Sequence, residues 1–205
     1  MNRIKNNSVD EFVENKSRFI TYLQRVENEA EVTAFIKEVK KAHPKATHHC
    51  QASLINENLQ SSNDDGEPSG TAGLPMLEIL RKRNMEKIAA VVVRYYGGIK
   101  LGAGGLIRAY SKGVNEALNN ADIYQVKEIN KYKVVTSYPY ADQIEHLLNS
   151  ETILDKDYSI DVSFTYLSND KSLENKINEI TSGQAIIEFV ERKEVEILKK
   201  EDSDD

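Results

Sequence analysis

The feature that most constrains the fold is a cluster of glycines directly after an apolar run. The segment from Lys87 to Tyr96 contains the run AAVVV, which is apolar on both faces and predicts a buried central strand. Five of the ten glycines of the chain follow within nine residues, at Gly97, Gly98, Gly102, Gly104 and Gly105. An amphipathic helix is predicted next, with its apolar stripe at Leu106, Ile107, Tyr110, Val114 and Leu118.

This order of strand, glycine-rich turn and helix is suited to binding an anion, because backbone N–H groups stay free at the positive end of the helix dipole. Basic and aromatic side chains flank the turn, and a tyrosine ring can stack on a base or a peptide. We therefore predict anion or nucleic-acid contacts from Arg94, Tyr96, Gly97, Gly98, Lys100, Gly102, Gly104, Gly105 and Arg108. The structural alternative is that the glycines permit positive φ angles or close backbone approach. The spacing matches neither a P-loop nor a dinucleotide-binding motif.

A second candidate site combines an acidic segment with a histidine. Residues 57–70 are polar and end in DDGEPSG, and a loop of this length is typical of a functional lid, here one that can close over the glycine-rich turn. Asp64, Asp65 and Glu67, together with His48, can hold magnesium or manganese or supply a general base. The alternative is ordinary turn chemistry, since Asp, Gly and Pro all favour bends.

The remaining N-terminal pattern alternates between strands and helices. A hairpin is predicted around Asn15 and Lys16, joining strands at residues 8–14 and 17–26. Helices are predicted at residues 29–43 and 71–84, with a strand at residues 46–55 between them. On that strand Cys50 faces inward with Ala52 and Leu54, which predicts core packing for the thiol.

Beyond residue 128 the pattern restarts. Strands at residues 131–137, 153–159, 161–167 and 185–190, with helices at 140–149 and 173–180, follow the βαββαβ order of a ferredoxin-like unit. We predict domains at 1–128 and 129–200 and a disordered tail at 201–205. The first 128 residues carry 18 basic and 16 acidic side chains, and the rest carry 9 and 17. This asymmetry places any phosphate-binding site in the first domain.

Composition restricts the compartment. The chain has one cysteine, so no internal disulfide can form, and this is typical of a reducing compartment. No apolar run approaches the roughly 20 residues that cross a bilayer, and the polar start lacks the apolar core of a signal peptide. We predict a cytoplasmic protein without a membrane partner.

Two long segments carry a family resemblance. DDGEPSGTAGLPML and VVVRYYGGIKLGAGGLIRAYSKGV closely resemble the two signature segments of the IMPACT family, and ATHHCQA resembles its short His/Cys segment. The resemblance implies an α+β protein whose residues 1–128 have the fold of the second domain of ribosomal protein S5. It also implies a ferredoxin-like second domain that resembles the last domain of the translocating elongation factor. Eukaryotic relatives regulate translation by interfering with activation of the starvation-responsive initiation-factor kinase.

These observations leave three functional hypotheses. In the first, the protein is a translation-associated regulator that contacts RNA, the ribosome or a translation factor through the glycine-rich turn. In the second, it is a metal-assisted hydrolase or phosphotransferase that acts on a small phosphorylated substrate or a peptide. In the third, the acidic second domain is a protein-interaction module. We favour the first, which requires no cofactor; the sequence does not determine the ligand or the oligomeric state.

Overall fold

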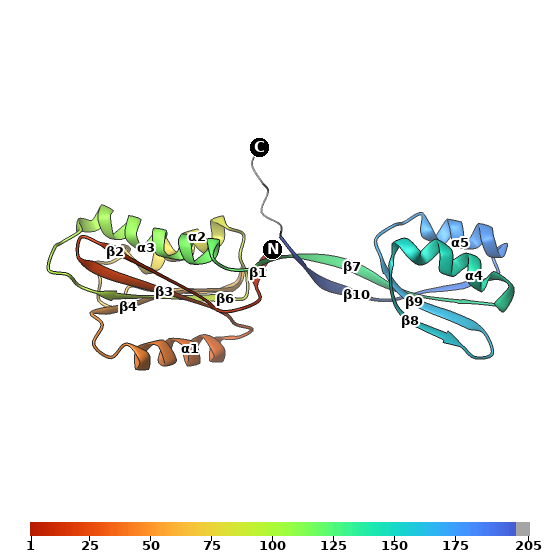
Figure 1. Cartoon of the computed structure of the whole chain (residues 1–205), viewed down its shortest axis with the longest axis horizontal. Coiled ribbons are helices and arrows are strands. Elements are labelled where there is room, and N and C mark those ends of the chain that lie inside the picture. The colour runs from red at the N-terminus through yellow and green to blue at the C-terminus, as the bar shows by residue number, and fades with distance from the viewer. Residues whose placement is uncertain (200–205) are drawn as a thin grey trace. The chain divides into compact units, whose positions relative to one another are not determined.

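The computed structural model describes residues 1–199 as two compact units, each with helices and strands (Figure 1). The first unit contains residues 1–126 and the segment that begins at Glu196, and the second contains residues 127–195. The chain therefore leaves the first unit after Val126 and returns to it within its last strand. The predicted α+β class with two domains is confirmed. The predicted tail at 201–205 lies outside the described residues.

A five-stranded antiparallel sheet forms the centre of the first unit, with the order β2-β3-β6-β4-β5. Its strands are β2 (Ser8–Glu14), β3 (Ser17–Arg25), β4 (His48–Asn56), β5 (Leu59–Asn63) and β6 (Ile88–Tyr95). The predicted hairpin is confirmed, since Asn15 and Lys16 form the turn between β2 and β3 with φ angles of 46° and 63°. The predicted central strand is also confirmed, because every residue of β6 before Tyr95 is buried.

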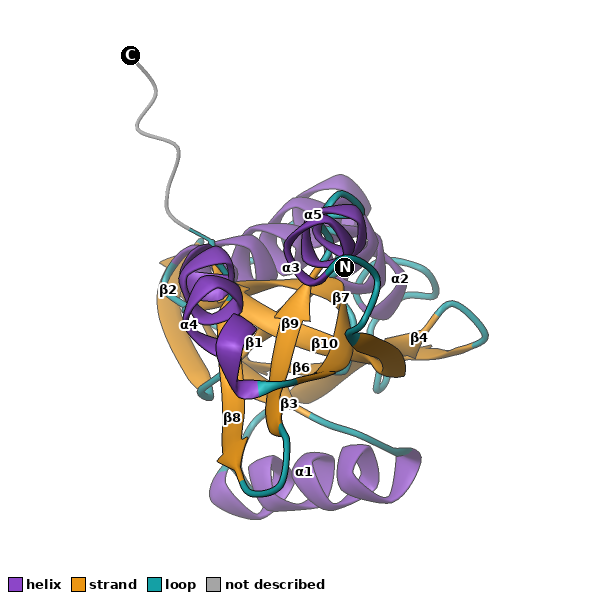
Figure 2. Cartoon of the chain, turned by 90° about the vertical axis from the view of Figure 1, so that its right-hand side faces the viewer, coloured by secondary structure: helices purple, strands orange, loops and turns teal. Residues whose placement is uncertain are grey.

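Helices cover both faces of this sheet (Figure 2). Helix α1 (Glu29–Ala42) lies on one face, while α2 (Gly73–Lys82) and α3 (Gly102–Asn119) lie on the other. Alternation along β6 sends Val91 and Val93 into the core beneath α1, and Ala90 and Val92 into the core beneath α2 and α3. The apolar run of β6 therefore contributes side chains to the cores on both faces of the sheet.

The structure corrects two predictions about the helices and strands of this unit. The loop predicted as a lid at residues 57–70 contains an edge strand, because Leu59–Asn63 pairs with β4. The helical periodicity predicts that Ile107 belongs to the apolar stripe, but Ile107 is 41% exposed, whereas Leu106 and Tyr110 are buried. The buried stripe of α3 therefore includes Leu106 and excludes its neighbour, which lies about 100° further around a helix of 3.6 residues per turn.

The second unit has ferredoxin-like topology. Its elements are β7 (Ile123–Thr136), α4 (Tyr138–Leu147), a 3₁₀ turn (Leu148–Ser150), β8 (Thr152–Tyr158), β9 (Val162–Ser168), α5 (Leu173–Thr181) and β10 (Ile186–Leu198). The strands lie in the order β10-β7-β9-β8, and the predicted βαββαβ order is confirmed. Ile144 of α4 and Ile177 of α5 pack with Val134 and Phe164 in its core.

Both long strands of the second unit begin or end in the first unit. The first residues of β7 pair with β1 (Asn2–Ile4), a strand that the sequence pattern did not predict. β7 and β10 are also longer than the predicted 131–137 and 185–190. Their additional stretches, IYQVKEIN and ERKEVEIL, mix apolar and charged residues without a continuous alternation, so the sequence pattern did not identify them as strand. No helix within residues 1–199 is long and apolar enough to cross a membrane.

Candidate functional site

A pocket of about 420 Å³ lies where the glycine-rich turn meets the start of β4. Its walls come from four segments of the first unit: the start of β4, the turn before α2, the end of β6 and the first turn of α3. The lining residues are Thr47, His48, Glu67, Pro68, Arg94, Tyr96, Lys100, Leu101, Gly102, Ala103 and Leu106. A larger groove of about 690 Å³ lies between α2 and α3, but the predicted chemistry converges on the smaller pocket.

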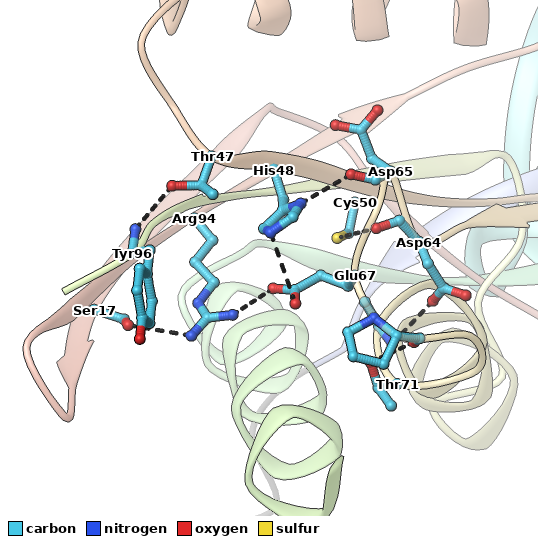
Figure 3. Close-up of polar contacts among 12 residues, drawn as sticks. Ser17, Thr47, His48, Cys50, Asp64, Asp65, Glu67, Thr71, Arg94 and Tyr96 are labelled. Carbon is cyan, nitrogen blue, oxygen red and sulfur yellow. Dashed lines mark hydrogen bonds and ion pairs between the residues drawn. The ribbon is translucent and has the colours of Figure 1, made fainter. Parts of the chain in front are cut away.

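The floor of the pocket is a buried ion pair between Glu67 and Arg94, which are 8% and 5% exposed (Figure 3). Glu67 Oε1 accepts hydrogen bonds from Arg94 Nη1 at 2.6 Å and from the Tyr110 hydroxyl at 2.8 Å. Burial raises the pKa of Tyr110 far above its ordinary value, so its hydroxyl remains a donor. Two hydrogen-bond donors therefore satisfy the buried carboxylate group.

Two aromatic rings lie close to the Arg94 guanidinium. It lies 5.4 Å from the ring centre of Phe19 and 5.4 Å from that of Tyr96, and its Nη2 donates to Ser17 Oγ at 3.3 Å. Its Nε is buried with no hydrogen-bond partner among the described residues. The prediction that Arg94 supplies positive charge to an external anion needs correction. Glu67 neutralises the guanidinium, and the Arg94 side chain is buried rather than exposed at the surface.

His48 enters the pocket from β4 in a defined orientation. Its Nδ1 lies 2.9 Å from the backbone carbonyl oxygen of Asp65, and a carbonyl only accepts, so Nδ1 carries the hydrogen. Its Nε2 faces Glu67 Oε2 at 3.8 Å, which is beyond hydrogen-bond distance (Figure 3). The Nε2 edge of His48 is therefore available on the pocket side.

Asp64 has a structural role outside the pocket. Its carboxylate accepts the backbone N–H groups of Gly70, Ala72 and Gly73 at 2.8 to 3.0 Å, at the start of α2. Partial burial acts to raise the pKa of Asp64, but these N–H groups outweigh it and hold the pKa below its ordinary value. The side chain fixes the turn that presents Glu67.

Asp65 is also committed to structure. Its carboxylate accepts from Lys40 Nζ at 2.8 Å and from the backbone N–H of His49 at 2.7 Å. With both aspartates engaged, the predicted metal site is not assembled, and residues 1–199 contain no group of three His, Cys, Asp or Glu side chains arranged to hold a metal. The geometry therefore gives no support to the metal-ligand role considered for Asp64, Asp65, Glu67 and His48, which stays a prediction.

Cys50 belongs to the core, as predicted. The residue is fully buried, and its Sγ donates to the carbonyl oxygen of Asp64 at 3.0 Å. Burial raises the pKa of the thiol to about 12, which keeps it protonated and unreactive at neutral pH.

Most of the clustered glycines have a structural reason to be glycine. A Cβ on Gly97 would lie 2.0 Å from the carbonyl oxygen of Lys16, and one on Gly105 would lie 2.9 Å from Leu101 Cβ. Gly98 and Gly102 have φ angles of +85° and +70°, which side chains rarely adopt. The structural alternative therefore explains these four positions, while Gly102 also lines the pocket.

The mouth of the pocket is basic and polar. Lys100 is exposed, Tyr96 is 45% exposed, and Gly102 and Ala103 begin α3. No side chain of the described residues caps this helix, so its first N–H groups remain available at the mouth. Arg108 lies outside the lining, as do Asp64, Asp65, Gly97, Gly98, Gly104 and Gly105.

The pocket thus unites two regions that the sequence pattern treated separately. It brings His48 and Glu67 together with Arg94, Tyr96 and Lys100. Thr47, Pro68, Ala103 and two leucines complete the lining and were not predicted, although Thr47 and Pro68 adjoin predicted residues.

Comparisons with known proteins support a common family. Residues 15–118 match the Impact N-terminal domain. YvyE of Bacillus subtilis (strain 168), described as an IMPACT family member, is 45% identical over 191 residues, covering 90% of this chain and 88% of that protein. The IMPACT family member YigZ of Escherichia coli (strain K12) is 42% identical, covering 70% of this chain and 73% of its own. A crystal structure of a hypothetical protein is 33% identical, with a TM-score of 0.59, covering 93% of this chain and 97% of its own.

Proposed function

Because this chain belongs to the IMPACT family, we propose that it is a translation-associated regulatory protein that binds its partner through the mouth of the Glu67–Arg94 pocket. The partner is RNA, alone or within the ribosome, or a translation factor. The family resemblance supports the link to translation, because it implies eukaryotic relatives that regulate that process. The cytoplasm is the corresponding compartment, and the proposal involves no membrane partner.

The observation that carries the proposal is the composition of the pocket mouth. Lys100 and the uncapped first turn of α3 supply positive charge and N–H donors, and the exposed Tyr96 ring lies beside them. These are the elements that bind phosphate oxygens and stack on bases. The net formal charge of the chain is −6, which disfavours binding of an anionic partner across a broad face of the protein. A localised positive site such as this pocket mouth is therefore the better-suited contact for an anionic partner.

The metal-assisted hydrolase or phosphotransferase is less well supported. Its predicted carboxylate ligands, Asp64 and Asp65, hold the backbone of the turn and of β4. Glu67 is committed to Arg94 and Tyr110. What remains for chemistry is His48 Nε2, and a single imidazole edge does not define a reaction.

The proposal is tested by binding to purified ribosomes and to ribosomal RNA fragments at several salt concentrations. We expect saturable binding that weakens as salt rises, and that weakens further in the Lys100→Ala variant. The control is a Lys37→Ala variant, which removes the same charge from the exposed side of α1 on the opposite face of the sheet. Equal binding by wild type and Lys100→Ala, or no saturable binding to either preparation, would refute the proposed site.

A further inference from the structure

The polarity of the pocket changes from its floor to its mouth. At the floor, Glu67 Oε1 accepts hydrogen bonds from Arg94 and Tyr110, whereas Glu67 Oε2 faces His48 Nε2 at 3.8 Å, beyond hydrogen-bond distance. At the mouth lie Lys100 and the first N–H groups of α3. A fitting ligand therefore places hydrogen-bond donors inward and negative charge outward.

The floor also offers a donor. Arg94 is 95% buried, it lines the pocket, and its Nε has no partner among the described residues. A buried donor without a partner is unfavourable, so an acceptor atom that reached it from the pocket would relieve this cost. A ligand that carries only donors, such as an amine, would leave it unsatisfied.

Part of the lining is apolar or aromatic. Tyr96 directly follows β6, and Leu106 and Pro68 also line the pocket. The volume of about 420 Å³ accommodates a ring system with a short polar extension. Inorganic phosphate alone would leave the apolar walls and the floor uncontacted.

We propose that this pocket binds one nucleotide, with the base between Tyr96 and Leu106 and the phosphate at Lys100 and the start of α3. A base edge carries both N–H donors and acceptors, which suits Glu67 Oε2 and Arg94 Nε together. The inference rests on the proposed function and deepens it, because an RNA partner is then held by one unpaired nucleotide. A free mononucleotide offers the same chemistry.

The test is calorimetric titration of the full chain with AMP, GMP, CMP and UMP, with inorganic phosphate, and with an unstructured RNA pentanucleotide. We expect nucleotides to bind more tightly than phosphate. Tyr96→Leu is expected to weaken nucleotide binding at least about fivefold, the low end of one base–aromatic stack, while Tyr96→Phe retains the ring and the affinity. Lys100→Ala is expected to weaken nucleotides and pentanucleotide alike.

The matched control is Lys37→Ala, which removes an exposed charge from α1 on the opposite face of the sheet. This substitution should not change the affinity for mononucleotides. Tighter binding of the pentanucleotide identifies a strand as the source of the nucleotide, and equal affinity identifies the free nucleotide; both outcomes support the inference.

Other outcomes overturn it. If phosphate binds as tightly as the nucleotides, the pocket is only an anion site. If ribosomes or pentanucleotide bind in a salt-sensitive way while mononucleotides neither bind nor compete, the nucleotide inference fails and the proposed function stands. If no ribosome, RNA or nucleotide binds, the nucleotide inference fails together with the RNA and ribosome forms of the proposed function.

Discussion

Replacing Glu67 with glutamine tests whether the buried ion pair supports the first unit. The substitution leaves the Arg94 guanidinium charged and 95% buried, and Tyr110 loses a charged acceptor. Removing one partner of a buried pair costs about 3 to 5 kcal/mol, because the other charge is left uncompensated. The amide oxygen of glutamine and Ser17 Oγ still accept from Arg94, so we expect a loss near the lower limit, about 3 kcal/mol.

The double-mutant cycle adds Arg94→Met and the combined variant. The combined variant removes both charges and retains an apolar side chain beneath Tyr96, so its cost should fall below the sum of the single costs by about 1 to 3 kcal/mol. The assay is urea unfolding followed by far-ultraviolet circular dichroism, since the chain has no tryptophan. Hydrogen exchange assigns the affected transition to the first unit, because the two units can unfold separately.

The reasoning is refuted if Glu67→Gln costs less than about 1 kcal/mol, the range of an exposed ion pair. It is also refuted if the two single costs simply add, because additivity means that the side chains do not interact. A changed dependence on urea concentration would instead indicate an altered native or unfolded state, and it would require repeating the comparison by exchange rates.

Three further predictions concern the stability of the first unit, each checked by urea unfolding. Gly97→Ala should destabilise the first unit by at least about 2 kcal/mol, because its Cβ would overlap the Lys16 carbonyl, whereas Gly104→Ala should change stability by less than about 0.5 kcal/mol. Asp64→Asn should cost about 1 to 2 kcal/mol at pH 7. Because the native pKa of Asp64 lies below its ordinary 3.8, this difference should be full above that pH and vanish as pH falls through the lower native pKa. Glu196→Ala should cost about 1 to 3 kcal/mol, since it removes an acceptor from Arg3 and from Arg25, and an unchanged midpoint would contradict that role.

Local sequence signals predicted most of the fold because they coincide with buried structure. The β6 run is apolar on both faces, and it lies between two helix-covered cores. The missed elements lack such signals. β1 has only three residues, and it is a strand because it pairs with Ile123–Gln125. β5 is largely exposed, and its sequence LQSSN does not alternate between apolar and polar residues. Pairing between distant segments cannot be read from periodicity.

The site was predicted in two halves for the same reason. In the sheet, His48 pairs in register with Arg94, and this pairing brings the His/Cys strand beside the glycine-rich turn. The burial of Arg94 could have been inferred, since it continues the apolar run AAVVV. The separate roles of Asp64, Asp65 and Glu67 could not, because three neighbouring carboxylates diverge only through the geometry of the turn.

The arrangement separates stability from binding within one pocket. Glu67 cancels the charge of Arg94, so the floor contributes shape and hydrogen-bonding groups while the net positive charge stays with Lys100 and α3 at the mouth. The Arg94 guanidinium also lies 5.4 Å from the Tyr96 ring and thereby positions the surface proposed for stacking. Substitutions at the mouth should therefore alter affinity without altering unfolding, whereas Glu67→Gln should alter both, because the ring loses the support beneath it.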